Sequence, residues 1–191
     1  KFNIDKAFQK TLTSNTLWNN TVLGGFLKTN IELKELKEVT DWFEHYLAPI
    51  VLSNTELDDY ITSSIDSTAI NKADIVKILK KADFNISDII IKGEEPSLQV
   101  ELEHTVKENR FNLPFQLESQ GTQRYYGFAG LLTLLLRGSM LIPIDELESS
   151  LHPDLFVHFL ISFILNSKSS QIIATTHNRE ILNNKDIFRN D

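Results

Sequence analysis

The sequence has 191 residues, 41% of them hydrophobic and 24% charged, and its formal net charge at pH 7 is −7. This length fits one domain with enough material for a core, and the absence of cysteine excludes disulfides and thiolate metal sites. The acidic balance, without a stripe of lysine and arginine, argues against direct nucleic-acid binding by this chain. The longest apolar zone, residues 128–144, is too interrupted to span a bilayer, and no signal peptide is visible. We therefore expect a cytoplasmic protein with no membrane contact.

Apolar residues at helical spacing dominate the first 83 residues. The clearest helix is predicted over residues 32–48, and Trp42 and Phe43 are assigned to the core because they share its repeat of three and four residues. Two further helices are predicted over residues 56–65 and 74–82. We therefore predict an α-helical subdomain over residues 1–83.

Alternating and β-branched residues next predict three strands, over residues 86–92, 98–106 and 112–117. The segment 93–97 contains glycine and proline and supplies the turn between the first two strands. His104 lies alone in the second strand, where a structural role fits it better than the role of a ligand. The third strand leads directly into the next motif.

Ser119 stands before an apolar run, residues 127–136, in the position of a helix N-cap. Gly121 would let backbone N–H groups approach an anion closely, and the positive end of the helix would add to the attraction. An ordinary capped helix is the alternative interpretation of this stretch.

Two carboxylates end the element that follows. Residues 141–144, Leu-Ile-Pro-Ile, are typical of a buried strand, and the chain then continues with Asp145 and Glu146. At such a sheet edge one acid can hold Mg²⁺, directly or through water, while the other orients and deprotonates a water molecule. Taken alone, the stretch fits an ordinary strand end equally well.

The segment 149–152, Ser-Ser-Leu-His, precedes a helix that is predicted to begin at Pro153. Residues 171–175 form a second buried strand, and His177 follows it. The order of strand, helix and strand over residues 141–175 predicts a parallel pair with a right-handed crossover. A histidine just past the second strand can hydrogen-bond a terminal phosphate, and a structural histidine is the alternative.

In order and spacing, these four stretches resemble the signature, Walker B, D-loop and switch-histidine motifs of ABC-type ATPases. The sequence is most similar to the ABC-like branch of bacterial AAA-family proteins, which is related to overcoming-lysogenisation-defect nucleases and to SMC-type ATPases. The resemblance is tight over residues 117–182. It implies an α/β fold, namely the C-terminal part of an ABC-type P-loop ATPase domain with its core over residues 84–191. Residues 1–83 would then be an α-helical insertion.

The resemblance also implies a role for each motif. Asp145 would hold Mg²⁺, Glu146 would be the general base, and His177 would respond to the γ-phosphate of ATP. In this family the signature grips the γ-phosphate of ATP bound to the other subunit, and the D-loop crosses the dimer interface. The residues that would contact the nucleotide in this way are Ser119, Gly121, Thr122, Gln123 and Ser150.

The signature departs from the transporter form, because Ser-Gln-Gly-Thr-Gln replaces Ser-Gly-Gly-Gln and one glycine is lost. A long helix separates it in sequence from the Asp145 strand. We expect this helix to hold Ser119 and Gly121 well away from the carboxylates of their own subunit, so that they serve only the other subunit.

These assignments imply an enzyme that binds and hydrolyses ATP with Mg²⁺ as a head-to-head homodimer. In this branch the ATPase often controls an effector, commonly a nuclease, in bacterial anti-phage defence, so a nuclease or another effector protein is the expected partner. None of the seven glycines is followed by lysine, so the phosphate loop pattern G-x-x-x-x-G-K-[ST] is absent. We expect that loop, the Walker A region, upstream of Lys1.

Two alternatives remain open at this point. The first is a degenerate, non-hydrolysing ATPase domain that acts as a scaffold and holds a partner. The second is a nuclease of the overcoming-lysogenisation-defect type, which would need a further metal-binding domain after Asp191.

Overall fold

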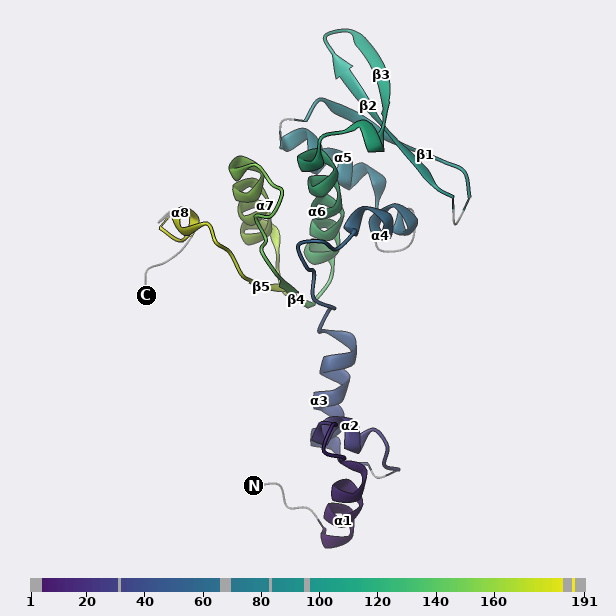
Figure 1. Ribbon diagram of the computed structural model, residues 1–191, viewed down its shortest axis with the longest axis vertical. Helices are drawn as coiled ribbons and strands as arrows, with labels where there is room; N and C mark the ends of the chain where they lie inside the picture. Colours follow the sequence, from purple (N-terminus) through teal and green to yellow (C-terminus); the bar gives the residue numbers. More distant parts are fainter. Residues whose placement is uncertain are drawn as a thin grey trace. The chain divides into compact units, whose positions relative to one another are not determined.

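The computed structural model of the chain describes residues 5–30, 32–65, 70–82, 84–94, 97–183 and 187. The chain folds into two compact units, Lys1–Leu47 and Ala48–Asp191, whose elements are labelled in Figure 1. None of the described helices is both long and apolar enough to cross a membrane.

The first unit consists of three helices, which are α1 (Lys6–Asn15), α2 (Val22–Phe26) and α3 (Lys34–His45). Its small core contains Phe8, Phe26 and Leu36, with Leu12, Leu23 and Leu33 packed against them. The helix predicted over residues 32–48 is present as α3. The prediction that Trp42 and Phe43 belong to the core is wrong.

Those two rings are 40% and 48% exposed and contact each other edge to face, with 5.1 Å between the ring centroids of Trp42 and Phe43. The reason is the small size of the unit. Its core takes Leu36 from one face of α3, and no described element covers the face that carries Trp42 and Phe43.

Helix α6 (Gln120–Arg137) is the centre of the second unit. Figure 1 shows α4 (Leu57–Ser64) and α5 (Lys72–Lys81) on one side of it and α7 (Pro153–Asn166) on the other. A helix that is apolar on every face must be buried on every face, and the α6 sequence meets that condition. Its fully buried large side chains include Tyr125, Tyr126, Phe128, Leu132 and Leu135.

This packing explains why the observed division of the chain differs from the predicted boundary at residue 83. Ile61 of α4, with Ile75 and Leu79 of α5, is fully buried in the same core as α6. These two helices therefore belong to the second unit, whereas the predicted helical subdomain grouped them with residues 1–47.

Helix α6 approaches α4 closely because it carries glycine on the facing side. A Cβ atom added at Gly130 would lie 2.3 Å from Cγ2 of Ile61, and one at Gly127 would lie 2.7 Å from Cβ of Leu57. Both distances are too short for real carbon atoms, so these two positions require glycine for the close approach of the backbones.

An antiparallel sheet packs against α5 through its first strand. Its strands β1 (Ile86–Lys92), β2 (Gln99–Val106) and β3 (Asn109–Pro114) pair in sequence order. The first two strands match the prediction closely. The third strand runs over Asn109–Pro114 instead of the predicted 112–117. It ends earlier because residues 115–117 form the 3₁₀ helix η1 (Phe115–Leu117), in which Phe115 turns into the core and contacts Tyr126.

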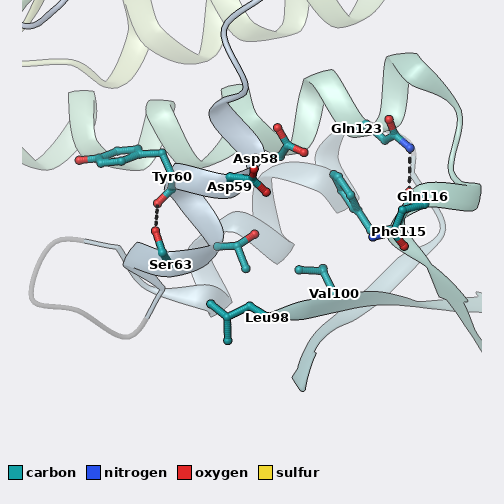
Figure 2. Close-up of a pocket in the computed structure, with 10 residues that line it drawn as sticks. Asp58, Asp59, Tyr60, Ser63, Leu98, Val100, Phe115, Gln116 and Gln123 are labelled. Carbon is teal, nitrogen blue, oxygen red and sulfur yellow. Dashed lines mark hydrogen bonds between the residues drawn. The ribbon is translucent and has the colours of Figure 1, made fainter. Parts of the chain in front are cut away.

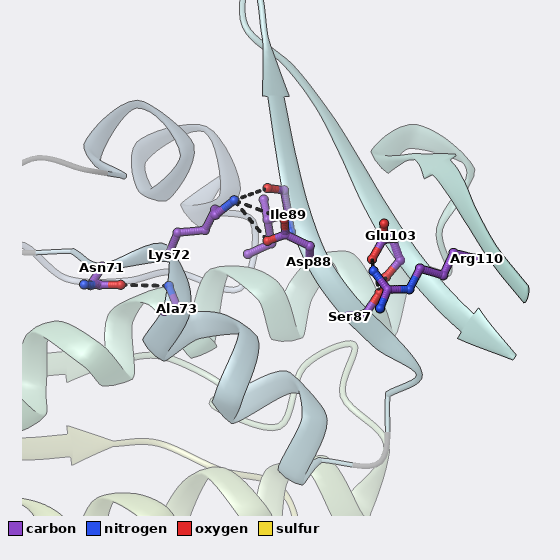
Figure 3. Close-up of polar contacts among 8 residues, drawn as sticks. All are labelled: Asn71, Lys72, Ala73, Ser87, Asp88, Ile89, Glu103 and Arg110. Carbon is purple, nitrogen blue, oxygen red and sulfur yellow. Dashed lines mark hydrogen bonds and ion pairs between the residues drawn. The ribbon is translucent and has the colours of Figure 1, made fainter. Parts of the chain in front are cut away.

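The first turn of α5 is joined to β1 by Lys72. Its Nζ atom lies 3.0 Å from Oδ1 of Asp88 and donates to the carbonyl of Ile89 at 3.1 Å (Figure 3). Burial raises the pKa of Asp88, but the hydrogen bonds from Lys72 and from the Ile89 N–H, together with the lysine charge, outweigh burial and leave that pKa below its usual value.

A second, parallel sheet consists of β4 (Leu141–Ile144) and β5 (Gln171–Ala174), which confirms the predicted parallel pairing. On its other side β4 contacts a short extended segment, where Val51 forms a parallel bridge with Ile144. Pro143 has no N–H to donate, and its carbonyl faces this bridge at 2.9 Å from the Val51 nitrogen. The edge of β4 that faces Val51 therefore tolerates a proline, because only an isolated bridge forms there. On the other edge all four residues of β4 pair with β5. After β5 the chain forms α8 (Arg179–Leu182).

We predict that Gly130→Ala lowers the free energy of unfolding of the 191-residue chain by about 1–3 kcal/mol, because the methyl group overpacks Ile61. Alanine favours a helix over glycine by about 1 kcal/mol, so an effect of propensity alone would have the opposite sign. Urea denaturation measures the difference. Gly121→Ala is the matched control, since the nearest atom to its new Cβ is 3.7 Å away. Equal or greater stability of Gly130→Ala would contradict the proposed close packing.

Candidate functional site

The signature stretch begins α6 with a side-chain cap, as predicted. Oγ of Ser119 accepts a hydrogen bond from the backbone N–H of Thr122 at 3.1 Å and lies 2.8 Å from the Thr122 hydroxyl oxygen. Thr122 is buried, so its side chain completes the cap. The helix behind it has 18 residues, and its dipole and free N–H groups favour an anion at this end.

The side chain of Gln123 turns back towards the backbone of the preceding residues, Phe115 and Glu118. Figure 2 shows its amide group at the carbonyl of Phe115, where Nε2 donates at 2.8 Å, and the same atom reaches the carbonyl of Glu118 at 3.3 Å. Gln123 therefore holds η1 against the start of α6. In this position its NH₂ group is used within the chain, and only its side-chain oxygen remains for a ligand.

A partly buried pair fixes Glu118, the residue before the cap. Nε2 of His104 lies 2.6 Å from Oε1 of Glu118, and the two side chains are 16% and 6% exposed. The ring of Phe111 stacks on His104 with 5.4 Å between centroids. This confirms a structural role for His104, which joins the antiparallel sheet to the signature.

The signature and the D-loop of the same chain are neighbours. A Cβ atom added at Gly121 would meet the Ser150 carbonyl oxygen at 3.7 Å, and Ser150 is exposed with a φ of 61°. The chain reverses after Gly138, so β4 and the loop that follows it run back towards the start of the helix.

The carboxylate pair is organised by Thr175, which sequence reasoning missed. Its hydroxyl donates to Oδ1 of Asp145 at 2.5 Å and accepts from the backbone N–H of Glu146 at 2.9 Å. Glu146 has a φ of 48°, an uncommon value for a residue with a side chain. The parallel register could have identified Thr175, because Ala174 pairs with Ile144 and the next residues of the two strands therefore meet.

His177 lies beside the predicted base. Its Nε2 atom is 3.4 Å from Oε1 of Glu146, and its side chain is 85% exposed. The backbone N–H of His177 donates to Oε1 of Glu148 at 2.6 Å. Glu148 thus holds the turn that carries His177.

The environment of Glu148 stabilises its charged form. Burial raises the pKa of Glu148, but hydrogen bonds from Thr176 and from backbone N–H groups, together with the charge on His177, outweigh burial. The pKa of this carboxyl group therefore lies below its usual value.

The described residues form two sets. Asp145, Glu146 and His177 surround Thr175 at the carboxyl ends of β4 and β5, and Ser119 and Gly121 adjoin Ser150 at the start of α6. Carboxylate oxygens suit Mg²⁺, and the helix start that Ser119 caps suits a phosphate group. The residues present therefore fit a phosphate group and Mg²⁺, and Asp145 is the acid predicted to hold the metal.

Two parallel strands, of which β4 ends in carboxylates, and the capped helix α6 are thus the elements that position the candidate site in this α/β domain. Residues 30–183 match the family model described as "AAA domain, putative AbiEii toxin, Type IV TA system". The match covers more than half of the chain, and the chain therefore belongs to this family. No curated protein matches the sequence.

Solved structures of SMC head domains have a similar fold. The SMC head domain from Thermotoga maritima is 19% identical with a TM-score of 0.51, over 81% of this chain and 55% of that chain. An SMC head bound to the C-winged helix domain of ScpA is 17% identical with a TM-score of 0.51, over 71% and 49%. The chain thus spans about half the length of each head domain. These similarities confirm the predicted fold class, the α/β architecture of the C-terminal part of a P-loop ATPase domain.

We predict that Glu148→Gln lowers the stability of the 191-residue chain at neutral pH. A lowered folded-state pKa contributes stability above the ordinary glutamate value of 4.5, and this contribution is lost as the pH falls through the folded-state pKa. The difference in melting temperature between the wild type and Glu148→Gln should therefore be largest above pH 4.5 and shrink below it. Thermal melts across pH test this, with Glu108→Gln in the exposed β2–β3 turn as the control. A difference that is constant with pH would contradict the role given to the Glu148 charge.

Proposed function

We propose that this chain supplies the catalytic carboxylates, switch histidine, signature and D-loop of an enzyme that hydrolyses ATP with Mg²⁺. The observation that carries the proposal is the arrangement around Thr175. One hydroxyl fixes both the Asp145 carboxylate and the backbone of Glu146, and His177 lies 3.4 Å from the Glu146 carboxylate. Membership in an AAA domain family supports the same chemistry.

Each residue of this set would have a distinct task. Asp145 would hold Mg²⁺, which when bound neutralises charge on the phosphates. The Glu146 carboxylate would orient a water molecule and accept its proton, as general-base catalysis requires. His177, exposed and beside Glu146, would donate a hydrogen bond to the γ-phosphate oxygen and respond to its release.

The second set would act on ATP bound to another copy of the chain. Gly121 and Ser150 lie together, so the signature and the D-loop present one continuous surface. That surface includes the capped start of α6, whose N–H groups would bind the γ-phosphate. A two-fold dimer in which each surface covers the carboxylates of its partner would make two complete sites. Ser119, Thr122 and Gln123 would shape the helix start that makes this contact.

The proposed activity also requires a phosphate-binding loop. Residues 1–191 contain no sequence of that pattern, so the loop would have to come from outside them. Strand β5 offers a place for the element that carries it. Ile173 is 60% exposed, and no described strand pairs with the outer edge of β5. A parallel strand added there would bring its own carboxyl end beside Asp145 and His177.

The consequence of hydrolysis would be the control of a partner protein, such as a nuclease or another effector in bacterial anti-phage defence. The description of the family names a putative toxin of a type IV toxin–antitoxin system. One of the similar structures is described as an SMC head bound to a domain of ScpA. The second description favours a protein partner. A scaffold that holds a partner without hydrolysing ATP is the second candidate, and the absent phosphate-loop pattern is the observation that favours it.

We predict that Glu146→Gln in the full-length protein lowers the ATP hydrolysis rate by about 10²–10⁴-fold, because glutamine cannot accept the proton. Nucleotide binding should survive, and the closed dimer should accumulate. Steady-state ATPase assays and nucleotide-binding titrations measure the two effects. Asp145→Asn is the contrasting variant, which should weaken Mg²⁺-dependent binding instead. Hydrolysis by Glu146→Gln at the wild-type rate would contradict the assignment, and absence of hydrolysis by the wild type would favour the scaffold.

We predict that two inactive variants, Gly121→Glu and Glu146→Gln, recover ATPase activity when they are mixed. In a mixed dimer one site carries both changes and the other carries neither, because each site takes Glu146 from one subunit and Gly121 from the other. Equal mixing should restore about a quarter of the wild-type rate if subunits pair at random. If mixed dimers form, as measured by native mass spectrometry, and no activity returns, then the signature does not act across the dimer.

A further inference from the structure

Arg124 follows the signature directly, and neither set of site residues includes it. Its side chain reaches from α6 to the loop of residues 52–55. Nη1 donates to the carbonyl of Thr55 at 2.8 Å, and Nη2 donates to the carbonyl of Leu52 at 3.2 Å. One guanidinium group thus binds both ends of this loop.

The surroundings of Arg124 show that it does more than fill space. Its guanidinium lies 4.9 Å from the ring centroid of the buried Phe128, and its buried Nε atom has no hydrogen-bond partner in the part of the chain that the structure describes. Burial lowers the pKa of Arg124, and the charge of Asp58 only partly opposes this. No ion pair holds Arg124 among the described residues. The guanidinium is only half-buried and has no ion pair among the described residues, so the feature that an apolar side chain could not provide at this position is its fork of donors.

The loop that Arg124 holds is tight and short. The N–H of Thr55 donates to the Leu52 carbonyl at 3.0 Å, and the N–H of Leu52 donates to the Thr55 hydroxyl at 2.8 Å. These two hydrogen bonds close the loop, and the guanidinium of Arg124 binds it at the Leu52 and Thr55 carbonyls.

The residue before this loop holds the strand that carries the metal-binding acid. Val51 donates to the Pro143 carbonyl at 2.9 Å, and its own carbonyl accepts the backbone N–H of Asp145 at 2.8 Å. Only one peptide unit separates the Val51 carbonyl from the Leu52 carbonyl, which Arg124 binds. The signature helix and the backbone of Asp145 are thus joined by hydrogen bonds and two residues of chain.

We propose that Arg124 is a positioning residue that transmits the position of the signature helix to Asp145 through residues 51–55. This inference rests on the proposed function, in which the signature meets the phosphate of one site and Asp145 holds the metal of the other. A cavity of about 530 Å³ separates the loop from Gln120, Gln123 and Ser150, and it leaves room for the helix start and the loop to shift together. Phosphate contact at one site would then adjust Asp145 at the second.

The first test uses the 191-residue chain without nucleotide. Arg124→Gln should raise the hydrogen-exchange rate of the Asp145 amide roughly tenfold, measured by NMR, because Val51, which accepts its hydrogen bond, adjoins the loop that loses its anchor. Arg137→Gln is the matched control, since Arg137 lies at the other end of α6 and pairs with Asp74. Unchanged exchange in Arg124→Gln, or an equal rise in both variants, would overturn the proposal.

The second test uses the full-length ATPase. Arg124→Gln should raise the Mg²⁺ concentration for half-maximal hydrolysis about 10–100-fold, the usual cost of losing a group that orients a metal ligand. Arg124→Lys should give a smaller rise, because one ammonium group cannot hold two carbonyls in a fork. If Arg124→Gln does not fold, the lysine variant decides both measurements, and wild-type values in it would overturn the proposal. If the wild-type protein does not hydrolyse ATP, the proposed function fails, while the exchange experiment still decides the role of Arg124.

Discussion

The close contact of α6 with α4 at Gly127 and Gly130 is the constraint on which the second unit depends. At Gly127 the two helix backbones approach closely, and at Gly130 the Ile61 side chain packs directly against the backbone of α6. The rest of α6 is surrounded by apolar side chains from α5, α7 and the antiparallel sheet. A helix so enclosed cannot tilt freely, because protein interiors are close-packed and resist small displacements. Its start, with Ser119 as cap, lies outside this enclosed part and is exposed at the surface.

The polar features of the site follow from that rigid element. The chain leaves α6, reverses, and sends β4 back along it, so the acids at the end of β4 and the D-loop return to the side where α6 begins. Thr175 then converts two neighbouring strand ends into one unit, because its hydroxyl bonds both Asp145 and the backbone of Glu146. Asp145, Glu146 and Glu148 lie in one short loop, and this concentration of negative charge is balanced within the described chain mainly by His177 and backbone N–H groups. A divalent cation would relieve the remaining repulsion.

Much of this arrangement was accessible from the sequence. The strand at residues 141–144, the cap at Ser119, the helix start at Pro153 and the parallel partner strand all follow local rules of periodicity and capping. Local rules fail where the outcome depends on what the rest of the chain places nearby. Trp42 and Phe43 have the spacing of core residues, yet the first unit is too small to cover them.

The same limit applies to the site itself. Thr175 and Arg124 act through partners about 30 and 70 residues away in sequence, and neither spacing is a recognisable motif. The division between the two units was also hidden, because α4 and α5 are helical like the first unit but bury their apolar faces against α6. Sequence patterns thus identified the elements and the chemistry-bearing residues, whereas the long-range hydrogen bonds that position them required the structure.

The central claim is that each ATP site is completed by two copies of the chain. The most direct measurement is the turnover per subunit of the full-length protein over a wide range of protein concentration, with sedimentation velocity giving the mass under the same conditions and with Mg²⁺ and ATP present. The account predicts that turnover per subunit falls in parallel with the fraction of dimer as the protein is diluted. Full turnover per subunit in samples that sediment as monomers would contradict it.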